Sequence, residues 1–270
     1  QGRAGANLWT ASVVALNPDT GSFVWGFQAS PHDTHDWDNV ETPVLFDAAI
    51  DGRPRHLLAQ ATRAGYFFVL DRTNGKALVS KGFVGVNWSK GVDPKGQPIP
   101  DPAKEPKVDG SLVNTPAQGG TNWFAPSYDP ETELFYVQAR RGFHIAYLYD
   151  TAPKPQGYAG GGYSLWGQSA LEALDVRSGD IKWSHEYSAT AGQVGSGILT
   201  TAGGLLFTGS AGPHLVAHDP RTGKILWHQR LLRPVSNGPS TWMLDGRQYL
   251  IVGAGDTLYG FTLPGPRDHE

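Results

Sequence analysis

The sequence contains no cysteine, which excludes disulfide bonds, thiolate metal sites and a cysteine nucleophile within these 270 residues. No apolar run approaches the roughly 18 residues that a transmembrane helix needs, so no membrane span is expected. Runs rich in Ala, Glu, Lys and Leu with a helical period are also missing, which argues against coiled coils and helical bundles. Charged residues make up only 17% of the chain and the net charge is −3. This balance argues against nucleic acid as a partner.

Glycine and aromatic residues are abundant instead. The 35 glycines and 20 prolines indicate many turns, and 9 Trp, 10 Tyr and 11 Phe are enough for a packed interior. A length of 270 residues suits one large domain or two small ones.

One phrase recurs along the chain: a short apolar strand, then Asn or Asp, two variable residues, a polar residue and Gly, and a Trp four residues after the Gly. Its copies have their Trp position at Trp25, Val79, Trp183 and Trp227, with Val79 replacing Trp in the second copy. Tyr128–Thr132 resembles a degraded fifth copy. The Asn or Asp anchors at 17, 71, 129, 175 and 219 are 44 to 58 residues apart.

The phrase predicts a β-hairpin. In the first copy the strand Ser12–Leu16 leads to Asn17, whose side chain caps the turn, and Gly21 takes a positive φ. Hairpins with this period are typical of four-stranded propeller blades. We interpret the Trp as a packing residue between blades, without a chemical role. The predicted fold is therefore all-β, a β-propeller of about four to five blades in this chain.

We expect residues 1–263 to form a partial β-propeller and 264–270 to form a polar C-terminal tail. Long loops at 87–120 and 151–164 interrupt the repeats. Loops of this length are usually functional or disordered, and on a propeller they shape a funnel over one face. The last predicted strand pair is Gln248–Val252 and Thr257–Thr262.

The segment Pro31–Val40 departs from the blade pattern because half of its residues can bind metal or transfer protons: His32, Asp33, His35, Asp36 and Asp38. In an extended strand, Asp36 and Asp38 lie on one face about 7 Å apart. Such a pair can share a hard cation, and one carboxylate can act as a general base. A solvated acidic loop is the alternative. A zinc hydrolase site is a further option, although the histidines lack the His-x-His-x-Asp-His order.

The segment from Pro31 to Asp38, with the sequence PHDTHDWD, resembles the active-site strand of pyrroloquinoline quinone (PQQ)-dependent alcohol dehydrogenases, the quinoproteins typified by methanol dehydrogenase. Three further segments resemble this family in its own order: 57–75, 119–128 and 246–261. The resemblance implies that the chain is the C-terminal half of an eight-bladed propeller in a periplasmic enzyme.

The resemblance also implies roles for single residues. Asp36 matches the catalytic base and metal ligand, and Asp38 matches an extra carboxylate of lanthanide-using members. Arg63 matches the Arg beside the reactive quinone carbonyl. Asn122 matches the Asn that hydrogen-bonds the quinone, and the adjoining Trp123 can form a wall of the pocket. The alternatives are a salt-bridging Arg63, a turn residue at Asn122 and a packing aromatic at Trp123.

The implied cofactors are PQQ and Ca²⁺ or a lanthanide, and the implied partners are a small alcohol, a periplasmic cytochrome c and the missing N-terminal half of the propeller. His35 departs from the family, because many members have Trp there. The family's other metal ligands, a Glu and an Asn, lie in the half before residue 1. We therefore expect this chain alone to leave the metal shell incomplete. A non-catalytic propeller scaffold, or a quinoprotein paralogue without cofactor, is the alternative function.

Overall fold

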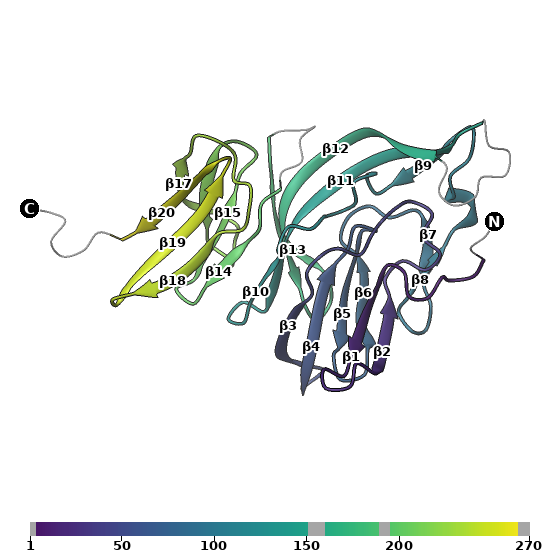
Figure 1. Cartoon of the computed structure of the whole chain (residues 1–270), viewed down its shortest axis with the longest axis horizontal. Coiled ribbons are helices and arrows are strands. Elements are labelled where there is room, and N and C mark those ends of the chain that lie inside the picture. The colour runs from purple at the N-terminus through teal and green to yellow at the C-terminus, as the bar shows by residue number, and fades with distance from the viewer. Residues whose placement is uncertain (1–3, 151–159, 189–194, 264–270) are drawn as a thin grey trace, which may run out of the picture.

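The computed structural model describes residues 4–150, 160–188 and 195–263, and strands dominate it (Figure 1). The elements in chain order are β1 (Ser12–Leu16), β2 (Phe23–Gln28), β3 (Val44–Ile50), β4 (Arg53–Ala61), β5 (Tyr66–Asp71), β6 (Lys76–Gly82), β7 (Ser89–Val92), β8 (Pro98–Pro100), the 3-10 turn η1 (Pro102–Lys104), β9 (Ser111–Asn114), β10 (Ser127–Asp129), β11 (Leu134–Leu148), β12 (Gly160–Asp175), β13 (Ile181–Glu186), β14 (Leu199–Thr201), β15 (Leu205–Gly209), β16 (His214–His218), β17 (Ile225–Arg230), β18 (Ser240–Leu244), β19 (Arg247–Ala254) and β20 (Thr257–Thr262). Within the described ranges, no helix has the length and apolar character needed to cross a bilayer.

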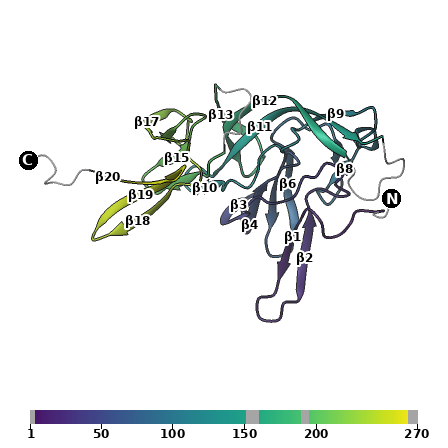
Figure 2. The ribbon, with the colours of Figure 1, turned by 45° about the horizontal axis from the view of Figure 1, so that its top comes forward.

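Successive antiparallel sheets give the chain the architecture of a partial propeller. In the sheets β3–β6, β10–β13 and β14–β17 these four strands are hydrogen-bonded in chain order, and β9 pairs with β11 as a fifth strand of the second sheet. The hairpin β1–β2 stands at one end of the row and the three-stranded sheet β18–β20 at the other (Figures 1 and 2). The all-β propeller prediction is confirmed. The predicted final strand pair is also found, as β19 and β20.

The repeated phrase forms the same turn in all four full copies. The anchor side chain accepts a hydrogen bond from the backbone amide two residues later, at 2.7 to 3.0 Å. The glycine that follows has a φ of 68 to 73°. The strand pairing also shifts register just before each anchor. The predicted cap and the predicted positive φ are therefore confirmed, because each turn needs both an acceptor and a residue without Cβ.

The Trp residues dock onto the corresponding hairpin of the next blade. The indole of Trp25 donates to the carbonyl of Arg72 at 3.0 Å. A Cβ atom on Gly75 would lie only 2.6 Å from the Trp25 ring. In the same way Trp183 donates to the carbonyl of Pro220 at 2.9 Å. The interpretation of these Trp residues as packing between blades is confirmed.

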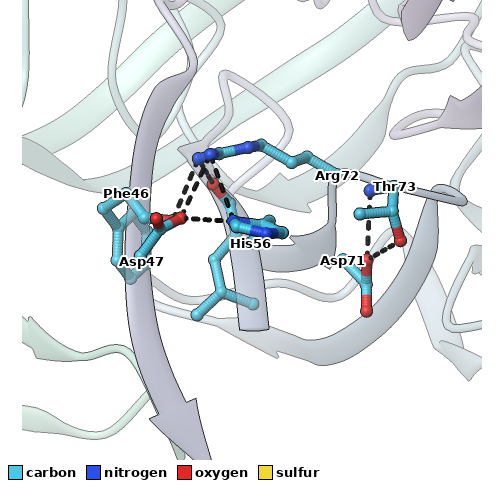
Figure 3. Close-up of polar contacts among 7 residues, drawn as sticks. Phe46, Asp47, His56, Asp71, Arg72 and Thr73 are labelled. Atoms are coloured by element: carbon cyan, nitrogen blue, oxygen red, sulfur yellow. Dashed lines mark hydrogen bonds and ion pairs between the residues drawn. The ribbon is translucent and has the colours of Figure 1, made fainter. Parts of the chain in front are cut away.

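The hairpin that receives Trp25 is held to its own sheet by side chains (Figure 3). Asp71 accepts hydrogen bonds from the backbone and hydroxyl of Thr73, which closes the turn. The next residue, Arg72, extends to Asp47 on β3 at 3.1 Å, and Asp47 also contacts His56 on β4 at 2.9 Å. These exposed contacts add little stability singly, but they fix the strand ends on which the indole docks.

The interpretation of Tyr128–Thr132 as a fifth copy is wrong. Asp129 does form a similar turn, because it accepts the amide of Glu131 at 2.9 Å, and Glu133 takes a positive φ of 55°. This turn, however, joins β10 to β11, which form the first hairpin of their sheet. The copy at Asp175 lies in the third hairpin of the same sheet, between β12 and β13. The local chemistry of the two turns is alike, and only their places in the sheet differ.

The segment 87–120 is more ordered than a long loop. It contains β7, β8, η1 and β9, and β9 pairs with the far end of β11. The strands β11 and β12 continue beyond β13 as a long hairpin toward this region (Figure 1). Of the second expected loop, 160–164 begins β12, whereas 151–159 lies outside the described residues, as does the expected tail at 264–270.

The apolar core is divided among the interfaces between sheets. The strand β5 has every residue buried, and its side chains alternate between two clusters. Phe67 and Val69 pack toward the sheet β10–β13, whereas Phe68 and Leu70 pack toward the β1–β2 hairpin. Sheets buried on both faces in this way require continuous apolar strands in place of a polar alternation.

Candidate functional site

The acidic segment lies in the connection between β2 and β3, which contains no strand. The carboxylate of the half-buried Asp33 accepts hydrogen bonds from the amides of His35 and Trp37 at 3.1 and 2.8 Å. Asp36 has a positive φ of 62°, so the expected extended conformation is wrong at this residue. Asp36 and Asp38 are nevertheless both exposed, on either side of the buried Trp37. Hydrogen bonding to Asp33, in place of strand pairing, presents the two carboxylates to solvent.

The opposite side of this segment is packed with rings. His35 stacks on Trp37 with their centroids 4.5 Å apart, and His144 lies edge-on to His35 at 5.9 Å. Burial, with a smaller contribution from His144, lowers the pKa of His35 to about 3. His35 is therefore a neutral packing residue at physiological pH.

Arg63 lies in the turn between β4 and β5 and contacts the acidic segment directly. Its Nη1 is 3.2 Å from Oδ2 of Asp38. The Arg63 side chain is only 11% exposed, whereas that of Asp38 is 64% exposed. The amide of Gly120 donates to the Arg63 carbonyl at 2.7 Å, and a Cβ on Gly119 would lie 2.7 Å from the Arg63 Cβ. Three segments far apart in the sequence therefore meet at Arg63.

Asn122 and Trp123 follow these two glycines. The Asn122 amide donates to the carbonyl of Gln118 at 3.0 Å, and its oxygen accepts the amide of Trp123 at 2.9 Å. Asn122 thus serves as a turn residue, while one amide hydrogen and one lone pair are left by these two bonds for a ligand. Trp123 is 53% exposed, and its ring centroid lies 4.4 Å from that of Phe124.

Glu41 was not singled out from the sequence. Glu41 is 3% exposed, and within the described chain neither carboxyl oxygen makes a hydrogen bond of good geometry. Burial raises the pKa of Glu41 to about 8, although its own backbone amide, and the positive charge and backbone amide of Arg63, act in the opposite direction. The only signal in the sequence was an acidic residue three positions before the first residue of β3, Val44.

A zinc site with both histidines is not formed. Nδ1 of His32 lies 2.7 Å from the Gly5 carbonyl and 3.1 Å from the Asn7 side chain, so this ring faces the N-terminal segment. Across residues 4–150, 160–188 and 195–263, no group of three or more His, Cys, Asp or Glu side chains is arranged to hold a metal ion. Asp36 and Asp38 can therefore contribute only part of a coordination shell.

Comparison with known proteins points to one family. The sequence profile of the PQQ glucose/ethanol/alcohol dehydrogenase β-propeller domain matches residues 1–84 and 165–250. This match includes Asp36, Asp38 and Arg63, but not Asn122 or Trp123.

Individual relatives agree with this match. The 1-butanol dehydrogenase (cytochrome c) of Thauera butanivorans is 36% identical over 93% of this chain and 38% of its own length. The structure of quinohemoprotein alcohol dehydrogenase ADHIIG from Pseudomonas putida HK5 superimposes with a TM-score of 0.83 at 32% identity, over 94% of this chain and 40% of that one. A europium-containing methanol dehydrogenase superimposes with a TM-score of 0.76 at 29% identity, over 90% of this chain and 44% of that one. The chain thus spans less than half the length of these relatives.

Proposed function

Because the chain belongs to the β-propeller domain family of PQQ-dependent glucose, ethanol and alcohol dehydrogenases, we propose that it forms part of a quinoprotein that oxidises an alcohol. The observation that carries this proposal is the convergence at Arg63. The exposed acidic segment reaches Arg63 through Asp38, and the segment from Gly119 to Trp123 packs on its backbone. A packing scaffold has no need for an ion pair between an exposed carboxylate, Asp38, and the nearly buried guanidinium of Arg63.

The donor set suits the implied cofactors. Exposed carboxylates such as Asp36 and Asp38 are the ligands that Ca²⁺ and other hard cations prefer. Nε of Arg63 is buried without a partner among the described residues, so the group retains hydrogen-bonding capacity. When bound, PQQ supplies a two-electron oxidant, and the calcium or lanthanide ion supplies Lewis acidity beside it.

The residues of this chain then take distinct roles. Asp36 accepts the proton of the alcohol hydroxyl as a general base, and it binds the metal together with Asp38. Arg63, fixed by its burial, places a positive charge where negative charge develops during the transfer. Asn122 has an amide hydrogen left to donate to a cofactor oxygen. The half-exposed ring of Trp123 forms one wall of the site.

The proposed partners follow from the relatives and from the sheet edges. We propose a periplasmic cytochrome c as the electron acceptor, and the name of one relative, a 1-butanol dehydrogenase (cytochrome c), supports a cytochrome in this role. The end hairpin β1–β2 has exposed apolar side chains at Leu16, Phe23 and Val24, each more than half exposed. Such surfaces are typical of an interface that another part of the molecule covers. We propose that the remaining half of the propeller packs there.

Asp36→Asn tests the assigned base. In the protein as its gene encodes it, we expect dye-linked alcohol oxidation to fall at least about 100-fold while PQQ stays bound. Asp51→Asn is the matched control, because Asp51 is also an exposed aspartate with a positive φ, 52° against 62° at Asp36. Turnover that is unchanged in Asp36→Asn would rule out the proposed role of this carboxylate.

A further inference from the structure

The positive charge of Arg63 is paired with Asp38, which is also a proposed metal ligand. Its side chain is 11% exposed, and its ion pair with Asp38 at 3.2 Å is formed through Nη1. Nε, on the inner side of the same group, is buried and has no partner among the described residues. The fold is strongly destabilised when a nearly buried guanidinium loses its anionic partner. If Asp38 coordinates a cation, its negative charge is shared between the cation and Arg63, and a second acceptor then stabilises the guanidinium.

Glu41 is held near Arg63 and can serve as such an acceptor. The side-chain amide of Gln60 on β4 donates to the Glu41 carbonyl at 2.6 Å, and Asn39 donates to the Gln60 oxygen at 3.1 Å. These bonds attach the segment 39–41 to the strand that leads into Arg63. Glu41 is only 3% exposed, and it lies near enough to Arg63 for the positive charge and backbone amide of Arg63 to favour ionisation of its carboxyl group. Neither carboxyl oxygen makes a hydrogen bond of good geometry within the described ranges.

The charges around Glu41 make its state depend on Asp38. Burial opposes its ionisation most strongly, Arg63 favours it, and the negative charge of Asp38 opposes it. A cation bound to Asp38 would cancel this last effect. It would also compete with Arg63 for the Asp38 oxygens. Both changes favour a charged Glu41 opposite the guanidinium.

We propose, building on the proposed function, that Glu41 is a positioning residue for Arg63. When Asp38 coordinates a metal ion, the Glu41 carboxylate becomes the counter-ion that keeps the guanidinium in place. The carboxylate pair Asp38 and Glu41 thus provides Arg63 with one exposed and one buried partner. Glu41 itself binds neither the metal nor the substrate.

The test measures metal affinity, which does not require turnover. Ca²⁺ and La³⁺ are titrated separately into the protein as its gene encodes it, freed of metal, in wild type, Glu41→Gln, Arg63→Gln and the double variant. We expect Glu41→Gln to weaken binding about ten-fold, a loss of the size seen when residues behind metal ligands are replaced. In the Arg63→Gln background the same change should have no effect, because the guanidinium that needs the counter-ion is gone.

Glu172→Gln is the matched control. Glu172 is also fully buried and paired with an arginine, Arg141, but it lies on β12 and contacts none of the site residues named above. Its replacement should leave metal affinity unchanged. Glu41→Gln preserves the shape of the side chain and removes an unpartnered buried acid, so it should fold, as its melting temperature will show.

Each other outcome overturns the inference. Equal weakening by Glu41→Gln in both backgrounds would mean that Glu41 acts without Arg63, and unchanged affinity would mean that it does not act at all. Absence of Ca²⁺ and La³⁺ binding in wild type would overturn the metal site of the proposed function as well, which distinguishes the two failures.

Discussion

Glu41→Gln also changes how the stability of the fold depends on pH. Burial raises the Glu41 pKa from 4.5 to about 8. Between these pH values the folded protein retains a proton that the unfolded chain releases. The stabilisation that this retained proton provides is therefore fully present below the unfolded pKa and is lost as the pH rises toward 8. The slope is about 1.4 kcal/mol per pH unit, so between pH 5 and pH 8 this carboxyl alone removes on the order of 3 kcal/mol.

The assay is urea unfolding of metal-free protein at pH 5 and pH 8. Glu41→Gln should lose about 3 kcal/mol less than wild type between these two conditions, since glutamine does not titrate. Glu172→Gln is a reference variant for the size of this change in pH dependence. Burial raises the Glu172 pKa from 4.5 to about 7, so that variant should flatten the same curve over a narrower range, ending near pH 7.

Parallel curves for wild type and Glu41→Gln would refute the reasoning. They would mean that Glu41 is already ionised in the fold at pH 5, and hence that a donor stabilises its carboxylate in the metal-free protein. Glu41 could then not be a counter-ion that becomes charged only when Asp38 coordinates a metal ion.

Two further predictions concern the docking of blades. Gly75→Ala should destabilise the fold by about 2 kcal/mol more than Gly21→Ala, because both glycines have a positive φ but only at Gly75 would a Cβ meet the Trp25 ring. The urea midpoints of the two variants compare these losses directly. Equal losses of stability would contradict the docking geometry. Trp183→Ala should cost about 3 kcal/mol and Trp227→Ala about 1 kcal/mol, since Trp183 packs on a complete hairpin whereas Trp227 is 41% exposed. A larger loss at Trp227 in the same assay would show that another segment covers it.

Local structure followed from the sequence wherever neighbouring residues determine it. The turn at Asp71 needs an acceptor at its start and a positive φ at Gly75, and both requirements are visible in the residue types. The same logic identified the turn at Asp129 but assigned it to the wrong hairpin. Sheet position depends on which strands pair, and a single turn does not carry that information.

The candidate site divides in the same way. The residue types of Asp36 and Asp38 indicated metal and proton chemistry, and the family resemblance identified Arg63 as a site residue. The backbone around Asp36 and Asp38, however, is set by hydrogen bonds to Asp33 and not by a strand.

Only the tertiary structure placed Asp38 against Arg63 and buried Glu41 beside it. Burial and charge pairing are created when segments distant in the chain pack together. The sequence by itself therefore determined the turns, the all-β fold and the acidic segment. The folded chain decided which carboxyl groups face solvent and which are buried beside the guanidinium.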